Sequence, residues 1–168
     1  MFRTASLSTK LIRIGASLLL VALASIGLTL WVTWQLEGGA AAVNEAGRMR
    51  MQTWRLASAV QTSLAPAELQ ALVGLFDDSL KLLRTGDPSR PLFVPWDENV
   101  NVKFTQVEKL WAQQRGQWLA SPALTAPASV AAAEEFVMAI DSLVLSIEQQ
   151  LSRLTAVLNL FQFVMMAL

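Results

Sequence analysis

Residues 43–55 read VNEAGRMRMQTWR, and this stretch decides how the rest of the chain is interpreted. Read as a helix, it carries an apolar seam whose members recur at intervals of four and three residues: Ala42, Ala46, Met49, Thr53, Leu56 and Val60. Gly47, Arg50 and Trp54 fall on a second line beside that seam, at i, i+3 and i+7. A guanidinium at the margin of a helix contact, next to a glycine that lets another backbone approach, predicts a site for a small anion.

Composition and charge exclude several classes of protein. The 168 residues favour a single domain, and they include no cysteine and no histidine. Disulfides, thiolate or imidazole metal sites and histidine-based catalytic triads are therefore excluded, as is the phosphoacceptor of a histidine kinase. All 13 acidic residues and 10 of the 13 basic ones follow the first apolar run, so this region is mildly acidic. We expect no nucleic-acid partner, no cofactor, no metal and no enzymatic activity in this chain.

The apolar residues are concentrated at the two ends. From Ile14 to Trp34, 21 residues carry no charge, which is long enough to cross a hydrocarbon core of about 30 Å. Basic residues precede this run and no acidic residue occurs before Glu37, so the positive-inside rule predicts a cytoplasmic N-terminus and an external domain. A cleaved signal peptide is the alternative to an uncleaved anchor. Residues 154–168 are also uncharged, and we expect them to begin a second span within a longer protein.

Between these ends, breakers separate four amphipathic helical patterns. We expect the first helix to end near Ser63, the second to cover residues 66–84, the third to start near Asp97 or Glu98 and the fourth near Ser129. No stretch alternates in the manner of a strand. The sequence predicts an all-α fold, a membrane-anchored antiparallel four-helix bundle whose first and last helices continue into transmembrane helices. The expected segments are a cytoplasmic N-terminus (1–13), a transmembrane helix (14–34), a periplasmic sensor domain (35–153) and the start of a second transmembrane helix (154–168).

Several residues also have a purely structural interpretation. Gly38-Gly39 predicts a flexible point or mild kink, because each glycine weakens a helix by about 1 kcal/mol relative to alanine. Asn44 either binds a ligand or caps the helix as it restarts after these glycines. Trp54 is either a ligand wall or a filler of the core or of an interface.

The charged residues have such an interpretation too. Arg50 is either an anion ligand or an ordinary arginine that is solvated or paired with Glu45 or Glu37. Asp77 and Asp78 are most simply a solvated helix face, and neighbouring helix positions point about 100° apart, so this pair does not form an acid–base site.

The pattern Asn44-x-Ala46-Gly47-x-x-Arg50-Met51-x-x-x-Arg55 resembles the P-box of NarX/NarQ-type nitrate/nitrite sensor histidine kinases. The helical module is also similar to the N-terminal region of PilJ-type pilus chemotaxis transducers. The resemblance implies a homodimer in the bacterial inner membrane that holds one nitrate or nitrite at the dimer axis. Carried over by position, Arg50 of each subunit would grip the anion, with backbone access at Gly47 and support from Arg55. The remaining members of the implied ligand-binding set are Asn44, Met51 and Trp54. Arg48, inside the box, and Trp54, in place of a smaller aromatic residue, depart from the pattern.

We therefore expect an input domain that senses nitrate or nitrite and passes a helix displacement to a cytoplasmic two-component transmitter outside this chain. Two alternatives stay open. One is the input domain of a chemotaxis-type transducer with another ligand or none. The other is a membrane-anchored helical scaffold that binds a protein partner and uses its arginines for salt bridges.

Overall fold

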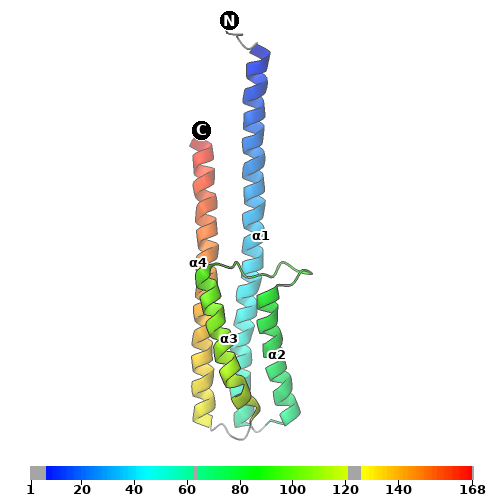
Figure 1. Ribbon diagram of the computed structural model, residues 1–168, viewed down its shortest axis with the longest axis vertical. Helices are drawn as coiled ribbons and strands as arrows, with labels where there is room; N and C mark the ends of the chain where they lie inside the picture. The colour runs from blue at the N-terminus through cyan, green and yellow to red at the C-terminus, as the bar shows by residue number, and fades with distance from the viewer. Residues whose placement is uncertain (1–6, 63, 121–125, 168) are drawn as a thin grey trace. The chain divides into compact units, whose positions relative to one another are not determined.

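Four helices make up nearly all of the computed structural model, which describes residues 7–62, 64–120 and 126–167 (Figure 1). They are α1 (Leu7–Gln61), α2 (Pro66–Thr85), α3 (Glu98–Leu119) and α4 (Ala126–Ala167). In these residues the only β-type pairing is an isolated bridge between Asp87 and Leu92. The prediction of an all-α fold with four helices is thus confirmed for the described part. The first helix ends at Gln61, and Ser63, where we expected its end, lies outside the described residues.

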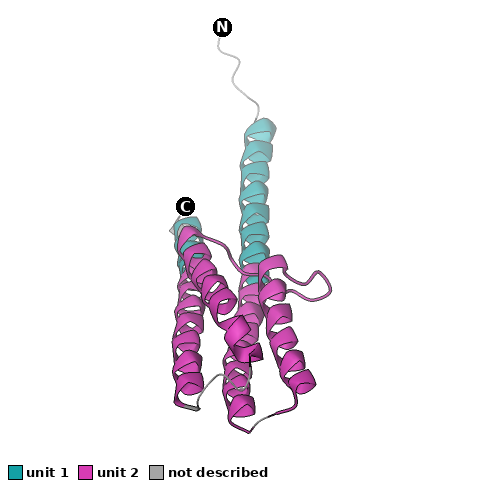
Figure 2. Cartoon of the chain, turned by 60° about the horizontal axis from the view of Figure 1, so that its bottom comes forward, with its two compact units in different colours: residues 1–34, 153–168 teal, residues 35–152 magenta. Residues whose placement is uncertain are grey.

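The chain divides into two compact units (Figure 2). Unit 1 consists of Met1–Trp34 and Arg153–Leu168, and unit 2 of Gln35–Ser152. Helices α1 and α4 contribute to both units, whereas α2 and α3 belong to unit 2 alone. Each unit is described below by itself.

Local chemistry accounts for the ends of α2 and α3. Pro66 occupies the first turn of α2, where its missing N–H costs nothing, and Glu68 adds negative charge there. The helix ends at Gly86, whose φ of 72° favours glycine and whose N–H donates to the Leu82 carbonyl at 2.8 Å. Asp97 caps α3, because its carboxylate accepts the Val100 N–H at 2.7 Å.

Helix α4 begins earlier than the sequence predicts. It starts at Ala126, three positions before the expected start near Ser129, and Pro127 lies in its first turn. Proline is tolerated there because the first N–H groups of a helix have no partner within the helix. Residues 121–125, which hold the rest of the expected break, lie outside the described residues.

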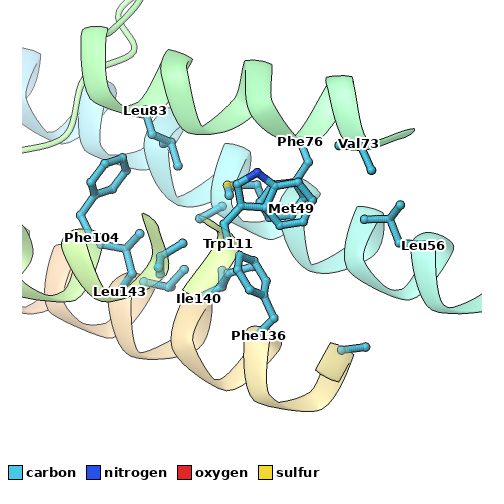
Figure 3. Close-up of a cluster of buried hydrophobic side chains, with 14 of the residues drawn as sticks. Met49, Leu56, Val73, Phe76, Leu83, Phe104, Trp111, Phe136, Ile140 and Leu143 are labelled. Atoms are coloured by element: carbon cyan, nitrogen blue, oxygen red, sulfur yellow. The ribbon is translucent and has the colours of Figure 1, made fainter. Parts of the chain in front are cut away.

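One hydrophobic core fills unit 2 and receives side chains from all four helices (Figure 3). The Phe76 and Trp111 rings stack with their centroids 4.1 Å apart, and Phe136 meets Phe76 edge-on at 4.9 Å. Such aromatic contacts stabilise beyond the burial of their area. The seam predicted on α1 faces this core: Ala42, Ala46, Met49, Thr53 and Leu56 are buried, and Val60 packs partly against the cluster.

The Gly38-Gly39 pair is not a break in α1. The helix runs through both residues, and both are buried. A Cβ at Gly38 would collide with the Phe93 ring, and a Cβ at Gly39 would lie 2.5 Å from Leu151 Cδ2. The predicted flexible point or mild kink thus does not interrupt the helix, and the glycines instead admit two side chains from distant parts of the sequence.

The connection between α2 and α3 folds back onto α1. Asp87 accepts hydrogen bonds from the Ser89 N–H at 2.9 Å and the Ser89 hydroxyl at 2.6 Å, and forms an ion pair with Arg90 at 3.0 Å. Beyond this turn, the Phe93 N–H donates to the Gly38 carbonyl at 3.4 Å. The loop is thus attached to the start of the α1 portion of unit 2.

Unit 1 contains the apolar ends of the sequence. Among the described residues, α1 is the one helix whose length and composition would allow it to cross a membrane, and a signal sequence near the N-terminus meets the same criterion. Within this unit, Gln162 Nε2 donates to Thr29 Oγ1 at 3.4 Å, so a polar contact links the two apolar segments.

Candidate functional site

Apart from Ala46, which is buried, the residues of the box pattern lie at or near the side of α1 that turns away from the core. Asn44 and Arg55 are exposed, and so are the large apolar side chains of Met51 (54%) and Trp54 (44%). Their positions recur at three and four residues, as the buried seam does on the opposite side. We call this surface the box face, defined by Asn44, Gly47, Met51, Trp54 and Arg55. A helix with one fully buried side normally exposes polar residues on the other, so Met51 and Trp54 are unusual there.

Arg50 lies at the edge of the box face and pairs with α4. Its Nη1 donates to Asp141 Oδ1 at 2.7 Å, and the two side chains are 42% and 46% exposed. The predicted ion-pair partners for Arg50, Glu45 and Glu37, are therefore wrong. Glu45 lies five residues before Arg50, about 140° around the helix, and faces another part of the unit.

Glu45 instead forms a buried polar cluster. It is 2% exposed and accepts the Ser79 hydroxyl of α2 at 2.8 Å. Arg48, three residues further along α1, approaches Glu45 at 3.2 Å, and Arg90 of the loop lies 4.0 Å from the same oxygen. A buried carboxylate needs such partners, because an unpaired charge is costly away from water. Arg48, which departs from the P-box pattern, thus pairs with a carboxylate of its own helix, while Ser79 and Arg90 link that carboxylate to other parts of unit 2.

Gly47 gives room to the Arg50 side chain. The only foreign atom within 4 Å of a Cβ built at Gly47 is Arg50 Nη2, at 3.6 Å. The guanidinium therefore lies along α1 beside Gly47, with Nη1 on Asp141 and Nη2 facing the glycine. Among the described residues, no acceptor other than Asp141 contacts Arg50, and no acceptor contacts Arg55.

The structure brings some predicted site residues together and separates others. The Arg50 guanidinium lies beside Gly47, whereas Asn44, Met51, Trp54 and Arg55 share only the box face within one chain. Asn44 is not a helix cap, because it lies inside the uninterrupted α1. The ligand-binding assignment of these residues stays a prediction. Among the described residues, no three acidic, cysteine or histidine side chains are grouped closely enough to hold a metal ion.

A second arginine–aspartate contact, between α2 and α3, is of a different kind. Asp77 accepts the Trp111 indole N–H at 2.7 Å and two donors of Arg115, at 2.8 Å from Nη2 and 3.1 Å from Nε. The interpretation of Asp77 as part of a purely solvated face is therefore wrong. Burial raises the pKa of Asp77, but the hydrogen bonds from Arg115 and Trp111 and the Arg115 charge together hold that pKa below its usual value.

Asp141 is the residue that sequence reasoning missed, and Glu45 is the one to which it gave the wrong partner. Asp141 is the one acid between Glu135 and Glu148, next to the buried positions Ile140 and Leu143. An isolated acid beside an apolar stripe was the available signal, although it does not identify the partner. Glu45 was considered only as a partner of Arg50, and its burial against Ser79 was not predicted.

Comparison with known proteins supplies one family. The profile described as PilJ, type IV pili methyl-accepting chemotaxis transducer N-term, matches residues 31–136. The match spans α2, α3, the box on α1 and the first part of α4. No curated protein matches the chain.

Proposed function

Because the chain belongs to the family of type IV pili methyl-accepting chemotaxis transducer N-terminal domains, we propose that it is the sensory input part of a membrane-bound, chemotaxis-type transducer. The single observation that carries this proposal is the family match over residues 31–136, which includes the box and most of unit 2. A two-component kinase, which the NarX/NarQ resemblance implied, is the less favoured output. The output domain in either case would lie outside this chain.

The proposed topology anchors unit 2 in the bacterial inner membrane. Residues 14–34 would form the first transmembrane helix and residues 154–168 the start of the second, with residues 1–13 in the cytoplasm and residues 35–153 in the periplasm. Support comes from the apolar, exposed surface of α1 between Ile14 and Leu30, and from the basic residues that precede it.

We further propose that unit 2 is an antiparallel four-helix bundle. Gly39 faces Leu151 while Arg50 meets Asp141, so a step forward along α1 corresponds to a step backward along α4. The α2–α3 pair behaves likewise, since Asp77 meets Arg115 whereas Arg84, further along α2, meets Glu108. Both patterns favour the up-and-down arrangement with short connections.

The partner proposed for the box face is a second copy of the chain. Met51 and Trp54 on α1 and Met138 and Leu145 on α4 are exposed apolar side chains. Met51 and Trp54 follow Arg50 within one turn of α1, and Met138 and Leu145 lie one turn before and one turn after Asp141 on α4. Exposed apolar side chains of this size are typical of surfaces that another protein covers. A helix-to-helix contact across a two-fold axis would bring the two Arg50 side chains near one another.

A small oxyanion, nitrate or nitrite, is the proposed ligand of this dimer. Arg55 has no acceptor among the described residues, and Arg50 uses only one of its nitrogens, so donors remain for a planar oxyanion. The alternative of a protein-binding scaffold is supported by the ion pair between Arg50 and Asp141, because this arginine already has a carboxylate partner.

The proposal is tested on the whole chain in lipid nanodiscs. We expect a dimer by mass measurement, and thermal stabilisation that saturates with sodium nitrate or nitrite but not with chloride at equal ionic strength. Arg50→Ala should abolish this stabilisation, and Arg50→Lys should retain little of it, because lysine keeps the charge but not the planar donors.

Trp54→Arg should shift the chain toward monomer, whereas Leu75→Arg, at an equally exposed apolar position on α2, should not. A dimer without any anion response would favour the ligand-free transducer. A monomer that captures a protein partner through the box face would favour the scaffold.

A further inference from the structure

We propose that Asp141 is a built-in competitor for the anion: it holds Arg50 while the site is empty, and a bound oxyanion displaces it. The exchange would release a contact between α1 and α4 at the moment of binding. This inference rests on the proposed anion site and specifies how occupancy of that site is converted into a change between two helices.

The geometry of the Arg50–Asp141 contact favours exchange. A single hydrogen bond of 2.7 Å joins Nη1 to Oδ1, and both side chains are almost half exposed. Exposed pairs of this kind contribute little to stability, because water and salt screen them. Breaking the contact therefore costs little, and the freed carboxylate is already close to solvent.

An oxyanion can occupy Arg50 more completely than Asp141 does. Nη2 faces Gly47 and has no acceptor among the described residues, so Asp141 uses only one of the two terminal nitrogens. Two oxygens of a planar anion match two guanidinium nitrogens in parallel, and such paired bonds are stronger and more directional than one. A bound anion would also repel the Asp141 carboxylate, since like charges at contact distance are unfavourable.

The Asp77–Arg115 pair differs from the Arg50–Asp141 pair in the number of hydrogen bonds that the carboxylate accepts. Arg115 gives two nitrogens to Asp77, and Trp111 donates to the same carboxylate. Both oxygens of Asp77 thus accept hydrogen bonds, whereas Asp141 accepts from Arg50 alone among the described residues. Of the two contacts, only the one at the box face is built to be exchanged.

The release would act on the two helices that also supply unit 1. Helices α1 and α4 carry the apolar segments, and in unit 2 they meet at Arg50–Asp141 and again where Leu151 packs on Gly39. Loss of the first contact leaves the second and the shared core in place. The exchange would thus change the freedom of α1 relative to α4 within unit 2 without unfolding it.

The first test measures nitrate and nitrite affinity of the whole chain in nanodiscs. Asp141→Asn removes the competing charge, so we expect its anion affinity to rise by about two- to five-fold, the scale of an exposed ion pair. Asp78→Asn, the same chemical change at an exposed position of α2, should leave the affinity at the wild-type value.

The second test measures separation between α1 and α4. The chain has no cysteine, so Ser58→Cys and Gln149→Cys place spin labels at exposed positions on the two helices. With an excess of unlabelled chain, saturating nitrate should change the intrachain distance distribution, and Asp141→Asn should produce the same change without nitrate.

The outcomes separate the two proposals. If wild-type chain binds nitrate and Asp141→Asn binds it no better, with unchanged distances, the exchange is refuted while the anion site stands. If neither wild-type chain nor Asp141→Asn responds to any anion, the anion site fails and the exchange fails with it.

Discussion

Two arginine–aspartate contacts join helices in unit 2, and they differ in how completely the carboxylate is used. Asp77, between α2 and α3, accepts two nitrogens of Arg115 and the indole N–H of Trp111, beside the stacked rings of the core. Asp141, between α4 and α1, accepts one nitrogen of Arg50, in a pair that is about as exposed as the Asp77–Arg115 pair. The α2–α3 interface is therefore stabilised by polar and apolar contacts together. The α1–α4 interface is stabilised mainly by packing, and its Arg50 and Asp141 side chains can still bind other groups.

The largest loss of stability should come from a change at the α2–α3 interface. Trp111→Ala removes the ring that stacks on Phe76 and the donor to Asp77, and should destabilise unit 2 by about 3–5 kcal/mol. Thermal or urea unfolding followed by circular dichroism measures this. Trp54→Ala, at an exposed position of the box face, is the matched control and should lower the stability of the subunit by less than about 1 kcal/mol. Equal effects of the two changes would remove the basis of the comparison.

Gly39 tests the packing of the α1–α4 interface. Gly39→Ala places a methyl group against Leu151 and should destabilise the unit by about 1–2 kcal/mol, because the strain exceeds the gain in helix propensity. Gly74→Ala, in the interior of α2 with open space around it, should instead stabilise by about 0.5–1 kcal/mol. A stabilising Gly39→Ala would mean that α1 and α4 do not pack closely here.

Acid should weaken the contacts of Asp77 at the α2–α3 interface. The folded-state pKa of Asp77 lies below its ordinary value of 3.8, so its contribution is complete above that value and is lost as the pH falls through the folded-state pKa. Asp77→Asn should cost about 1 kcal/mol at neutral pH, a modest figure because the pair is partly exposed. It should also flatten the acid limb of a plot of unfolding midpoint against pH. An unchanged acid limb would show that Asp77 does not contribute to it.

The smallest effect is expected at the exchangeable pair. Asp141→Asn without added anion should change the free energy of unfolding by less than about 0.5 kcal/mol, because only one half-exposed ion pair is lost. The same unfolding experiments measure this. If Asp141→Asn lowered the free energy of unfolding as much as Asp77→Asn does, the Arg50–Asp141 pair would be a structural contact. The contrast between the two interfaces would then disappear.

Periodicity alone predicted which side of α1 enters the core. Ala46, Met49 and Leu56 are buried because helix geometry fixes the angular positions of residues along one element. The helix starts were predictable to a few residues, and the error at Ala126 arose because Pro127 was read as a breaker although a first turn accepts proline.

Contacts between distant residues were not predictable in this way. Gly38-Gly39 looked flexible because propensity describes a helix in isolation, and neither Phe93 nor Leu151 is near in sequence. The partner of Arg50 was misassigned for the same reason, since the register between α1 and α4 brings Asp141 to it. The motif drew attention to one face of α1, but the carboxylate that pairs with Arg50 there became known only from the fold.

The order in which the unit assembles follows from the spacing of these contacts along the chain. Asp77 meets partners 34 and 38 residues away across a single connection, whereas Arg50 and Asp141 are 91 residues apart. Closing a longer loop costs more entropy, so we expect α2 and α3 to pair early and the α1–α4 contact to complete folding. Contacts made after the transition state mainly govern the rate of unfolding. The place where the chain finishes folding would then also be the place where it opens most readily.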